Sequence, residues 1–230
     1  MDPFEDLPTD LITPLLSVTH QTSKVSLKVL LHVDKFWHKE VTHYCIKCKI
    51  QKQLHCYDIA FEGSLEVLKW GHSIGITCDH YSYSFAALKG HLPILQWGLD
   101  NGCVMSMWIF VNAAKNGHLH VLEWARINGC RWDPMASQRA AENGHLEVLK
   151  WIRENNYEWN SDTCSGAARG GHLEILKWAH AHGCPLNQLV CEYAARNGNL
   201  EMLKWARENG CDWDTDVEKM AKEKWPNVFH

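Results

Sequence analysis

Histidine and cysteine are the residue types in this sequence whose spacing could do chemistry, because both bind metals and both take part in catalysis. Four histidines recur every 27 residues, at His91, His118, His145 and His172. Stacked helices lie roughly 8–10 Å apart, whereas ligand bonds to zinc are about 2 Å long. Such a column cannot share one ion, so we expect each ring to bond locally to backbone at the start of its helix.

The ten cysteines raise the question of disulfides. Cys103, Cys130, Cys184 and Cys211 occupy one slot of a repeated unit. A disulfide needs Cα atoms within about 7 Å, which is less than the spacing between stacked layers, so these residues should not pair. We expect small buried thiols in a reducing compartment.

A possible zinc motif lies further upstream. Cys45 and Cys48 form a CxxC, with His43, His55 and Cys56 nearby. Strong zinc signatures carry a second ligand pair at a defined distance, and none follows here. We therefore predict ordinary thiols in a helical connector, and neither a metal nor a cofactor. A zinc-binding connector is the alternative.

Other chemistry is not indicated. The sequence contains no nucleophile with a base, phosphate loop or carboxylate pair that stands apart from the repeat, so we predict that the protein is not an enzyme. The net charge of -4 disfavours nucleic acid and acidic membrane surfaces. The start MDPFEDLPTD is acidic, and no apolar run reaches membrane-spanning length. We expect a protein that is not secreted.

The unit that positions these side chains is 27 residues long, and its clearest copy reads NGHLEVLKWIREN from Asn143 to Asn155. Its lead glycines are Gly63, Gly90, Gly117, Gly144, Gly171 and Gly198. A fixed period of this size is typical of a solenoid, in which each unit stacks on its neighbours. We therefore predict repeats over residues 53–230.

The residue pattern of each 27-residue unit predicts two helices joined by a tight turn. A good N-cap residue stands eleven residues before each glycine from Gly90 to Gly198, and before the corresponding position of the last half-repeat: Asp79, Ser106, Asp133, Asn160, Asn187 and Asp214. Alanine recurs four residues before the glycine. After it, leucines at positions +2 and +5 and an aliphatic residue at +4 predict a buried stripe. Position +12 is glycine or, once, Asn156, which suits a left-handed helix end.

Tryptophan stands seven residues after the glycine in all six copies: Trp70, Trp97, Trp124, Trp151, Trp178 and Trp205. Each copy meets the same neighbours in a stack. The column is therefore predicted to serve packing rather than ligand binding.

These motifs resemble the ankyrin repeat. GHLEILKWAHAHGCPLN, from Gly171 to Asn187, is similar to that family's second helix and following turn, and the paired alanines to its first helix. The unit is shorter than the usual length of about 33 residues, which resembles a finger-poor variant associated with large DNA viruses of protists. The resemblance implies an all-α solenoid of about six helix pairs with a C-terminal capping half-repeat, in a viral protein of the host cytoplasm or nucleus.

Residues 1–45 carry two amphipathic segments that resemble an F-box. The matching residues are Leu7, Pro8, Ile12 and Leu16 in the first half and Val33 and Trp37 in the second. The resemblance implies an F-box-like helical domain that docks onto the Skp-type adaptor of a cullin–RING ubiquitin ligase, followed by a connector over residues 46–52. Pro14 departs from the pattern because it lies inside the first predicted helix. A plain helical cap over the first repeat remains the alternative.

The candidate binding site lies on the first helix of each unit, where the copies differ. Nine and five residues before the glycine stand side chains suited to an interface: Tyr81, Phe85, Trp108, Asn112, Met135, Arg139, Leu189 and Tyr193. Tyrosine, tryptophan and arginine anchor protein interfaces. The alternative is that some of these residues pack under neighbouring loops.

The two resemblances together imply an adaptor that recruits a target protein to an SCF-type ubiquitin ligase. The alternative is a stand-alone ankyrin-type binding module or inhibitor with no ligase link. Under either hypothesis we expect a monomer whose partners are proteins, not nucleic acid or membranes.

Overall fold

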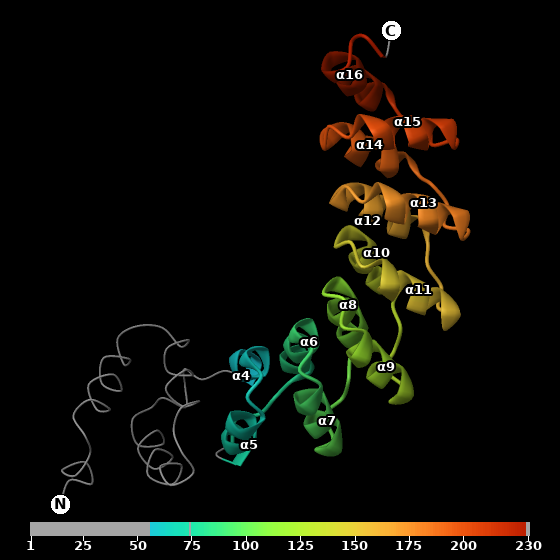
Figure 1. The fold of residues 1–230 in the computed structure, drawn as a ribbon. Coiled ribbons are helices and arrows are strands. Elements are labelled where there is room, and N and C mark those ends of the chain that lie inside the picture. Colours follow the sequence, from blue (N-terminus) through green and yellow to red (C-terminus); the bar gives the residue numbers. More distant parts are fainter. Residues whose placement is uncertain (1–55, 74, 229–230) are drawn as a thin grey trace, which may run out of the picture. The chain divides into compact units, whose positions relative to one another are not determined.

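A computed structural model describes residues 56–73 and 75–228 of the 230-residue chain. These residues form thirteen helices and no strand (Figure 1). In chain order the helices are α4 Cys56–Glu62, α5 Leu65–Ser73, α6 His80–Lys89, α7 Leu92–Asp100, α8 Trp108–Lys115, α9 Leu119–Ile127, α10 Met135–Glu142, α11 Leu146–Glu154, α12 Ser161–Gly170, α13 Leu173–Ala181, α14 Gln188–Arg196, α15 Leu200–Glu208 and α16 Thr215–Lys224. The predicted six helix pairs, from α4/α5 to α14/α15, and the final half-repeat α16 are confirmed.

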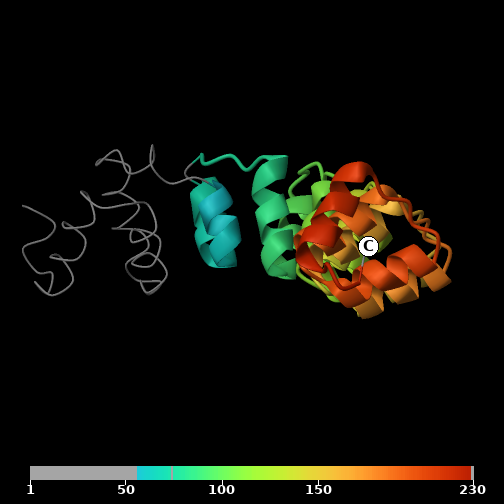
Figure 2. The ribbon, with the colours of Figure 1, turned by 90° about the horizontal axis from the view of Figure 1, so that it is seen from above.

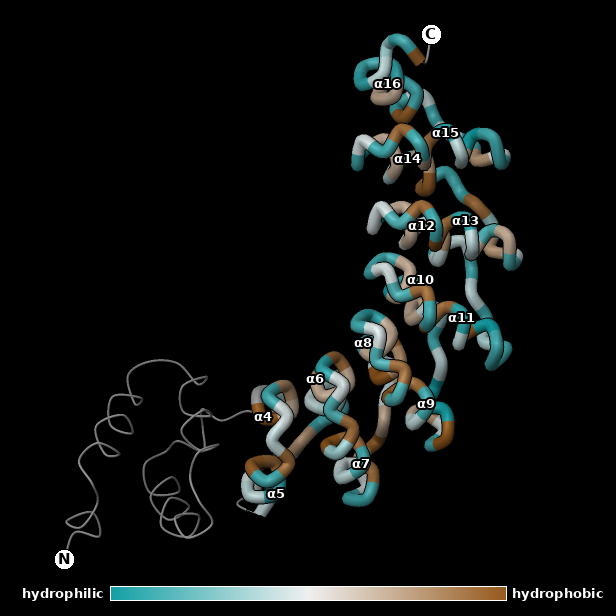
Figure 3. The backbone as a smooth tube through the Cα atoms, viewed as in Figure 1, coloured by the Kyte–Doolittle hydropathy of each residue, from teal (hydrophilic) through white to brown (hydrophobic). Residues whose placement is uncertain are grey.

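The chain divides into two compact units. The first contains α4, α5, most of α6, and α7, and the second contains α8 to α16. In the second unit the first helices α8, α10, α12, α14 and α16 stack on one another, and α9, α11, α13 and α15 form a second layer beside them (Figures 1 and 2). Hydrophobic residues of this unit lie mainly where the two layers meet (Figure 3).

Four of the six predicted N-caps accept a backbone hydrogen bond. These are Asp79 from Ser82 N, Asp133 from Met135 N, Asn160 from Asp162 N and Asp214 from Val217 N, with donor–acceptor distances of 2.8–3.0 Å. Asp133 lies one residue before the N-cap of α10, which is Pro134. The prediction is wrong for Ser106, because α8 begins only at Trp108 and the Ser106 hydroxyl is buried without a partner in the described residues. Asn187 is the N-cap of α14, as predicted, but its Oδ1 accepts from the Ser165 hydroxyl at 2.9 Å rather than from a backbone N–H of the helix.

The predicted left-handed position twelve residues after the glycine is confirmed. Asn156 has a φ of 57° and is the one non-glycine residue with positive φ in the described part of the chain. Glycine fills the equivalent place in the other units, as at Gly129 with a φ of 68°. Asparagine tolerates this conformation better than other side-chain-bearing residues.

The second helices bury a stripe that differs in part from the predicted one. Positions +4 and +5 are buried in every unit, as at Val148 and Leu149. The leucine at +2, represented by Leu146, is only half-buried, so its assignment to the core was wrong. The residue at +8, such as Ile152, is fully buried instead. The reason is geometric, because +4, +5 and +8 share the helix face that meets the first helices.

The first helices meet through small residues. Their alanines four residues before the glycine are all buried, namely Ala86, Ala113, Ala140, Ala167, Ala194 and Ala221. Gly166 in α12 extends this close contact. A Cβ atom at Gly166 would lie 2.5 Å from the Gln138 carbonyl oxygen of α10. Helices α10 and α12 therefore approach as closely as they do because this residue has no side chain.

We expect Gly166→Ala to lower the free energy of unfolding by about 1–3 kcal/mol, because α12 must move away from α10. Alanine by itself favours a helix over glycine by about 1 kcal/mol, so the sign of the change tests the contact. Gly71→Ala is the matched control, since its Cβ would meet neighbours at an ordinary 3.4 Å. Urea unfolding curves measure both changes. Stabilisation by Gly166→Ala would contradict the close approach.

The tryptophan column packs against neighbouring repeats, as predicted. Trp70 and Trp124 are buried, and Trp97, Trp151, Trp178 and Trp205 are half-buried. Trp97 meets the ring of His72 edge-on with centroids 5.2 Å apart, and Trp205 meets His180 at 5.6 Å. Each histidine belongs to the preceding second helix. These tryptophans therefore connect consecutive repeats at the margin of the core.

The histidine column also joins consecutive 27-residue repeats, through contacts that the sequence did not predict. His91 Nε2 lies 3.1 Å from the Phe61 carbonyl oxygen, and His118 Nε2 lies 3.1 Å from that of Leu88. His145 forms the same bond thirty residues back in the chain, and His172 forms none in the described residues. The expected local bond was wrong. The last carbonyl groups of the first helix in the preceding repeat lack helical partners, and they lie within hydrogen-bonding distance of the histidine ring.

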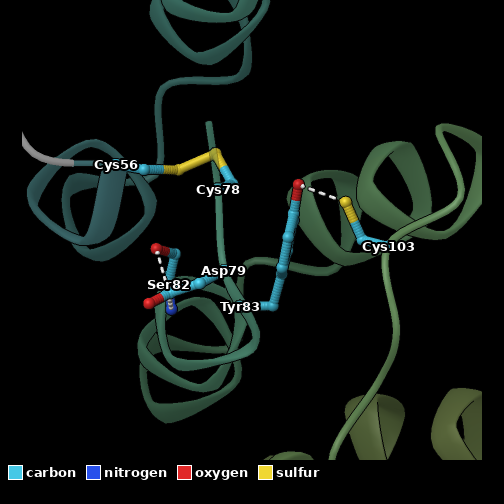
Figure 4. The surroundings of a disulfide bond; sticks show 6 residues. All are labelled: Cys56, Cys78, Asp79, Ser82, Tyr83 and Cys103. Atoms are coloured by element: carbon cyan, nitrogen blue, oxygen red, sulfur yellow. Dashed lines mark hydrogen bonds between the residues drawn. A yellow bond between two sulfur atoms is a disulfide. The ribbon is translucent and has the colours of Figure 1, made fainter. Parts of the chain in front are cut away.

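One disulfide contradicts the expectation of thiols throughout. Cys56 and Cys78 are bonded, with Cα atoms 5.3 Å apart (Figure 4). Cys56 begins α4 and Cys78 lies in the loop before α6, so the two occupy different slots and the layer spacing does not separate them. The cysteines that share one slot, Cys103, Cys130, Cys184 and Cys211, are free, as predicted, but only Cys184 and Cys211 are buried.

Two polar contacts lie close to the disulfide. The backbone N–H and hydroxyl of Ser82 donate to Asp79 Oδ1, which lowers the pKa of that carboxyl. The Cys103 thiol donates to the Tyr83 hydroxyl at 3.1 Å (Figure 4). Burial raises the pKa of Tyr83. Both contacts fix the start of α6 within the first unit.

Candidate functional site

The candidate site is described for each of the two compact units by itself, as the face of its first helices that is not used by the core. The residues eight and four positions before the glycine are buried, as at Ala136 and Ala140 of α10. None of the eight predicted interface residues is fully buried. Tyr81 is exposed, and Phe85, Trp108, Asn112, Met135, Arg139, Leu189 and Tyr193 are half-buried.

In the first unit, the predicted residues belong to an aromatic cluster. The ring of Phe85 in α6 lies 5.9 Å from that of Tyr57 and 6.3 Å from that of Phe61, both in α4. Tyr57 and Tyr81 expose 43% and 55% of their surface. Phe85 is therefore held by packing, while the two tyrosines present apolar rings with polar tips to the solvent.

In the second unit, the predicted residues belong to a charged network. Arg139 Nη1 lies 2.8 Å from Glu142 Oε2 within α10, and Arg169 Nε of α12 lies 3.3 Å from Glu142 Oε1. The Arg169 guanidinium also lies 6.0 Å from the centre of the Tyr193 ring of α14. The structure thus links Arg139 to Tyr193 across three helices. Trp108, Met135 and Leu189 lie outside this network.

Glu142, Arg169 and Arg196 were not among the predicted site residues. All three stand two positions before their glycine, and Arg196 Nη2 lies 2.7 Å from Glu192 Oε1 of the same helix α14. A signal was present, because this position carries a charge in four consecutive units, beginning with Lys115. Position +1 is dominated by histidine, whereas this position varies in sign and so marks surface rather than framework.

The described residues offer no metal centre. No group of three or more His, Cys, Asp or Glu side chains within residues 56–73 and 75–228 is arranged to hold an ion. Cys45 and Cys48 lie outside the described residues, as do the F-box-like docking residues Leu7, Pro8, Ile12, Leu16, Val33 and Trp37. No helix among the described residues has the length and apolarity needed to cross a membrane.

Comparison with known proteins agrees with this geometry. Residues 164–207 match the family model of ankyrin repeats in many copies. The structure is similar to the human ASB11 ankyrin repeat domain, with a TM-score of 0.53 and 18% sequence identity over 68% of this chain and 84% of that one. The described repeats have an ankyrin-type fold.

The other comparisons add little. The pentatricopeptide repeat protein PPR10, solved in complex with an 18-nt psaJ RNA element, is 14% identical over 96% of this chain and 39% of its own, with a TM-score of 0.36. No curated protein matches the sequence. The ankyrin-type repeats indicate a protein-interaction module, and neither the family match nor the structural match indicates an enzyme.

Proposed function

We propose that this chain is an adaptor that binds a target protein with the exposed face of its first helices. The observation that carries the proposal is the division of roles within those helices. The residues four and eight positions before the glycine build the core, whereas the eight predicted interface residues remain at least partly accessible and carry aromatic, aliphatic, polar and basic side chains. A surface of this composition is typical of interface anchors.

The side chains on this face are held in place before a partner binds. Phe85 packs against two rings of α4, and Arg139 and Arg169 share one carboxylate. Ordering a long side chain on binding costs about 0.5–1.5 kcal/mol. Side chains that are already ordered avoid part of this cost, which favours binding at this face.

The test begins with affinity capture from cell extract and identification of the target by mass spectrometry. Trp108→Ala and Tyr193→Ala are then expected to weaken binding of that target by roughly 2 kcal/mol or more each if they are anchors. Isothermal titration calorimetry measures the change. Ile127→Ala is the control, because Ile127 is 76% exposed but ends the second helix α9. An equal loss in the control, or none in the two variants, would rule out this face.

We further propose that residues 1–45 connect the bound target to a cullin–RING ubiquitin ligase through its Skp-type adaptor. The support is the F-box-like sequence pattern. Copurification with the Skp-type adaptor is expected for the natural chain and not for a Val33→Ala, Trp37→Ala double variant. Identical behaviour of the two chains would exclude the ligase link.

Pro14 favours the second candidate function, a binding module or inhibitor with no ligase link, because proline is unfavourable inside the helix that the F-box-like pattern predicts. This function predicts target binding without adaptor binding. A ubiquitin-transfer assay with the captured target separates the two candidates.

A further inference from the structure

We propose that Arg139, Arg169 and Arg196 form a subsite in the second unit for an acidic peptide segment of the partner. Carboxylates of Asp or Glu side chains would bind the three guanidinium groups. The inference rests on the proposed function, since it assigns a chemistry to part of the same face.

The charges of this subsite are layered. Arg139, Arg169 and Arg196 expose 34%, 51% and 62% of their side chains, whereas their carboxylate partners Glu142 and Glu192 expose only 19% and 22%. The negative groups therefore lie inward and the positive groups outward. A partner that approaches α10, α12 and α14 meets guanidinium groups first.

Each guanidinium retains hydrogen-bonding capacity. Arg139 uses Nη1 in its ion pair, Arg169 uses Nε, and Arg196 uses Nη2. A guanidinium carries five N–H donors, so each group has donors that form no other bond within the described residues. Arginine binds carboxylates through paired N–H groups. Glu142 fixes two of the three groups, so part of the cost of ordering them is already met.

Charge complementarity identifies the partner. The whole chain has a net charge of -4, yet this surface presents three arginines from consecutive repeats. Basic segments would be repelled here and acidic ones attracted. Tyr193, which lies beneath Arg169, and Leu189 one turn before it provide an apolar contact beside the charges. The segment that fits is thus acidic with an adjacent apolar residue.

The test is selection of a random peptide display library on the full chain. Peptides enriched by the natural protein are expected to be rich in Asp and Glu. Their affinity should fall about three- to thirtyfold for the double variant Arg169→Gln, Arg196→Gln, because two exposed charge pairs are lost. Binding should also weaken as salt is raised. The matched control Arg131→Gln, Lys204→Gln removes two exposed charges elsewhere in the second unit and should select the same peptides.

A second double variant distinguishes the loss of charge from a loss of folding. Arg169→Lys, Arg196→Lys keeps the charges and should recover binding in part, at low salt. Peptides without acidic enrichment, or acidic peptides that bind the glutamine variant equally well, would overturn the subsite. So would binding of a labelled ten-nucleotide uridine RNA by these arginines with no acidic peptide selected. In each of these cases, target binding that depends on Trp108 would leave the proposed function standing.

Discussion

Replacing Leu149 by alanine is expected to lower the free energy of unfolding by about 2–5 kcal/mol. Leu149 lies on α11 in the middle of the second unit and is fully buried. Removal of its isobutyl group leaves a cavity beside α10, against which α11 packs, and the neighbouring side chains can fill it only in part. Chemical denaturation followed by circular dichroism measures the change.

The control for this prediction is Leu146→Ala on the same helix. Leu146 is half-buried, so the loss should be about 1 kcal/mol, near half of the 1.5–3 kcal/mol for burial of a leucine side chain. The sequence pattern alone makes the two leucines equivalent. Equal losses would therefore support the pattern and contradict the packing found in the structure.

Reduction of the Cys56–Cys78 disulfide is expected to destabilise the first unit by about 3 kcal/mol, because the bond closes a loop across a sequence separation of 22 residues. Thermal unfolding with and without a reductant measures the effect.

The Cys56→Ser, Cys78→Ser variant is the control for this experiment. It should unfold like the reduced protein and show no further response to reductant. The same response to reductant in the natural chain and the variant would show that the bond does not form. In a reducing compartment the thiol form prevails, and the first unit then lacks this stabilisation.

The fold could be predicted from the sequence to a large extent, because the same local signals recur in every repeat. Gly129 and Asn156 mark one helix end, Asp214 and Asn160 mark helix starts, and the 27-residue step fixes the stacking order. Such signals depend on backbone conformation over a few residues, which sequence specifies directly. The exposure of Tyr81 and the partial exposure of Tyr193 follow from the same periodicity.

The network at the candidate site could not be predicted in the same way. Glu142 binds arginines of two different helices, and the Arg169 guanidinium lies over a ring of a third. Sequence indicated that these positions were variable and polar. Which carboxylate turns inward, and which guanidinium outward, depends on distances between helices that only packing sets.

The sequence by itself determined the all-helical repeat, its period, its helix ends and the face on which the units differ. Only the tertiary structure decided which side chains of one repeat contact the next repeat. His91 bonds to a carbonyl group of the preceding unit rather than near its own helix start, and Cys56 finds Cys78 because a loop returns to α4. The physical reason is that local conformation depends on neighbours in the chain, whereas these contacts depend on the spacing of helices after close packing.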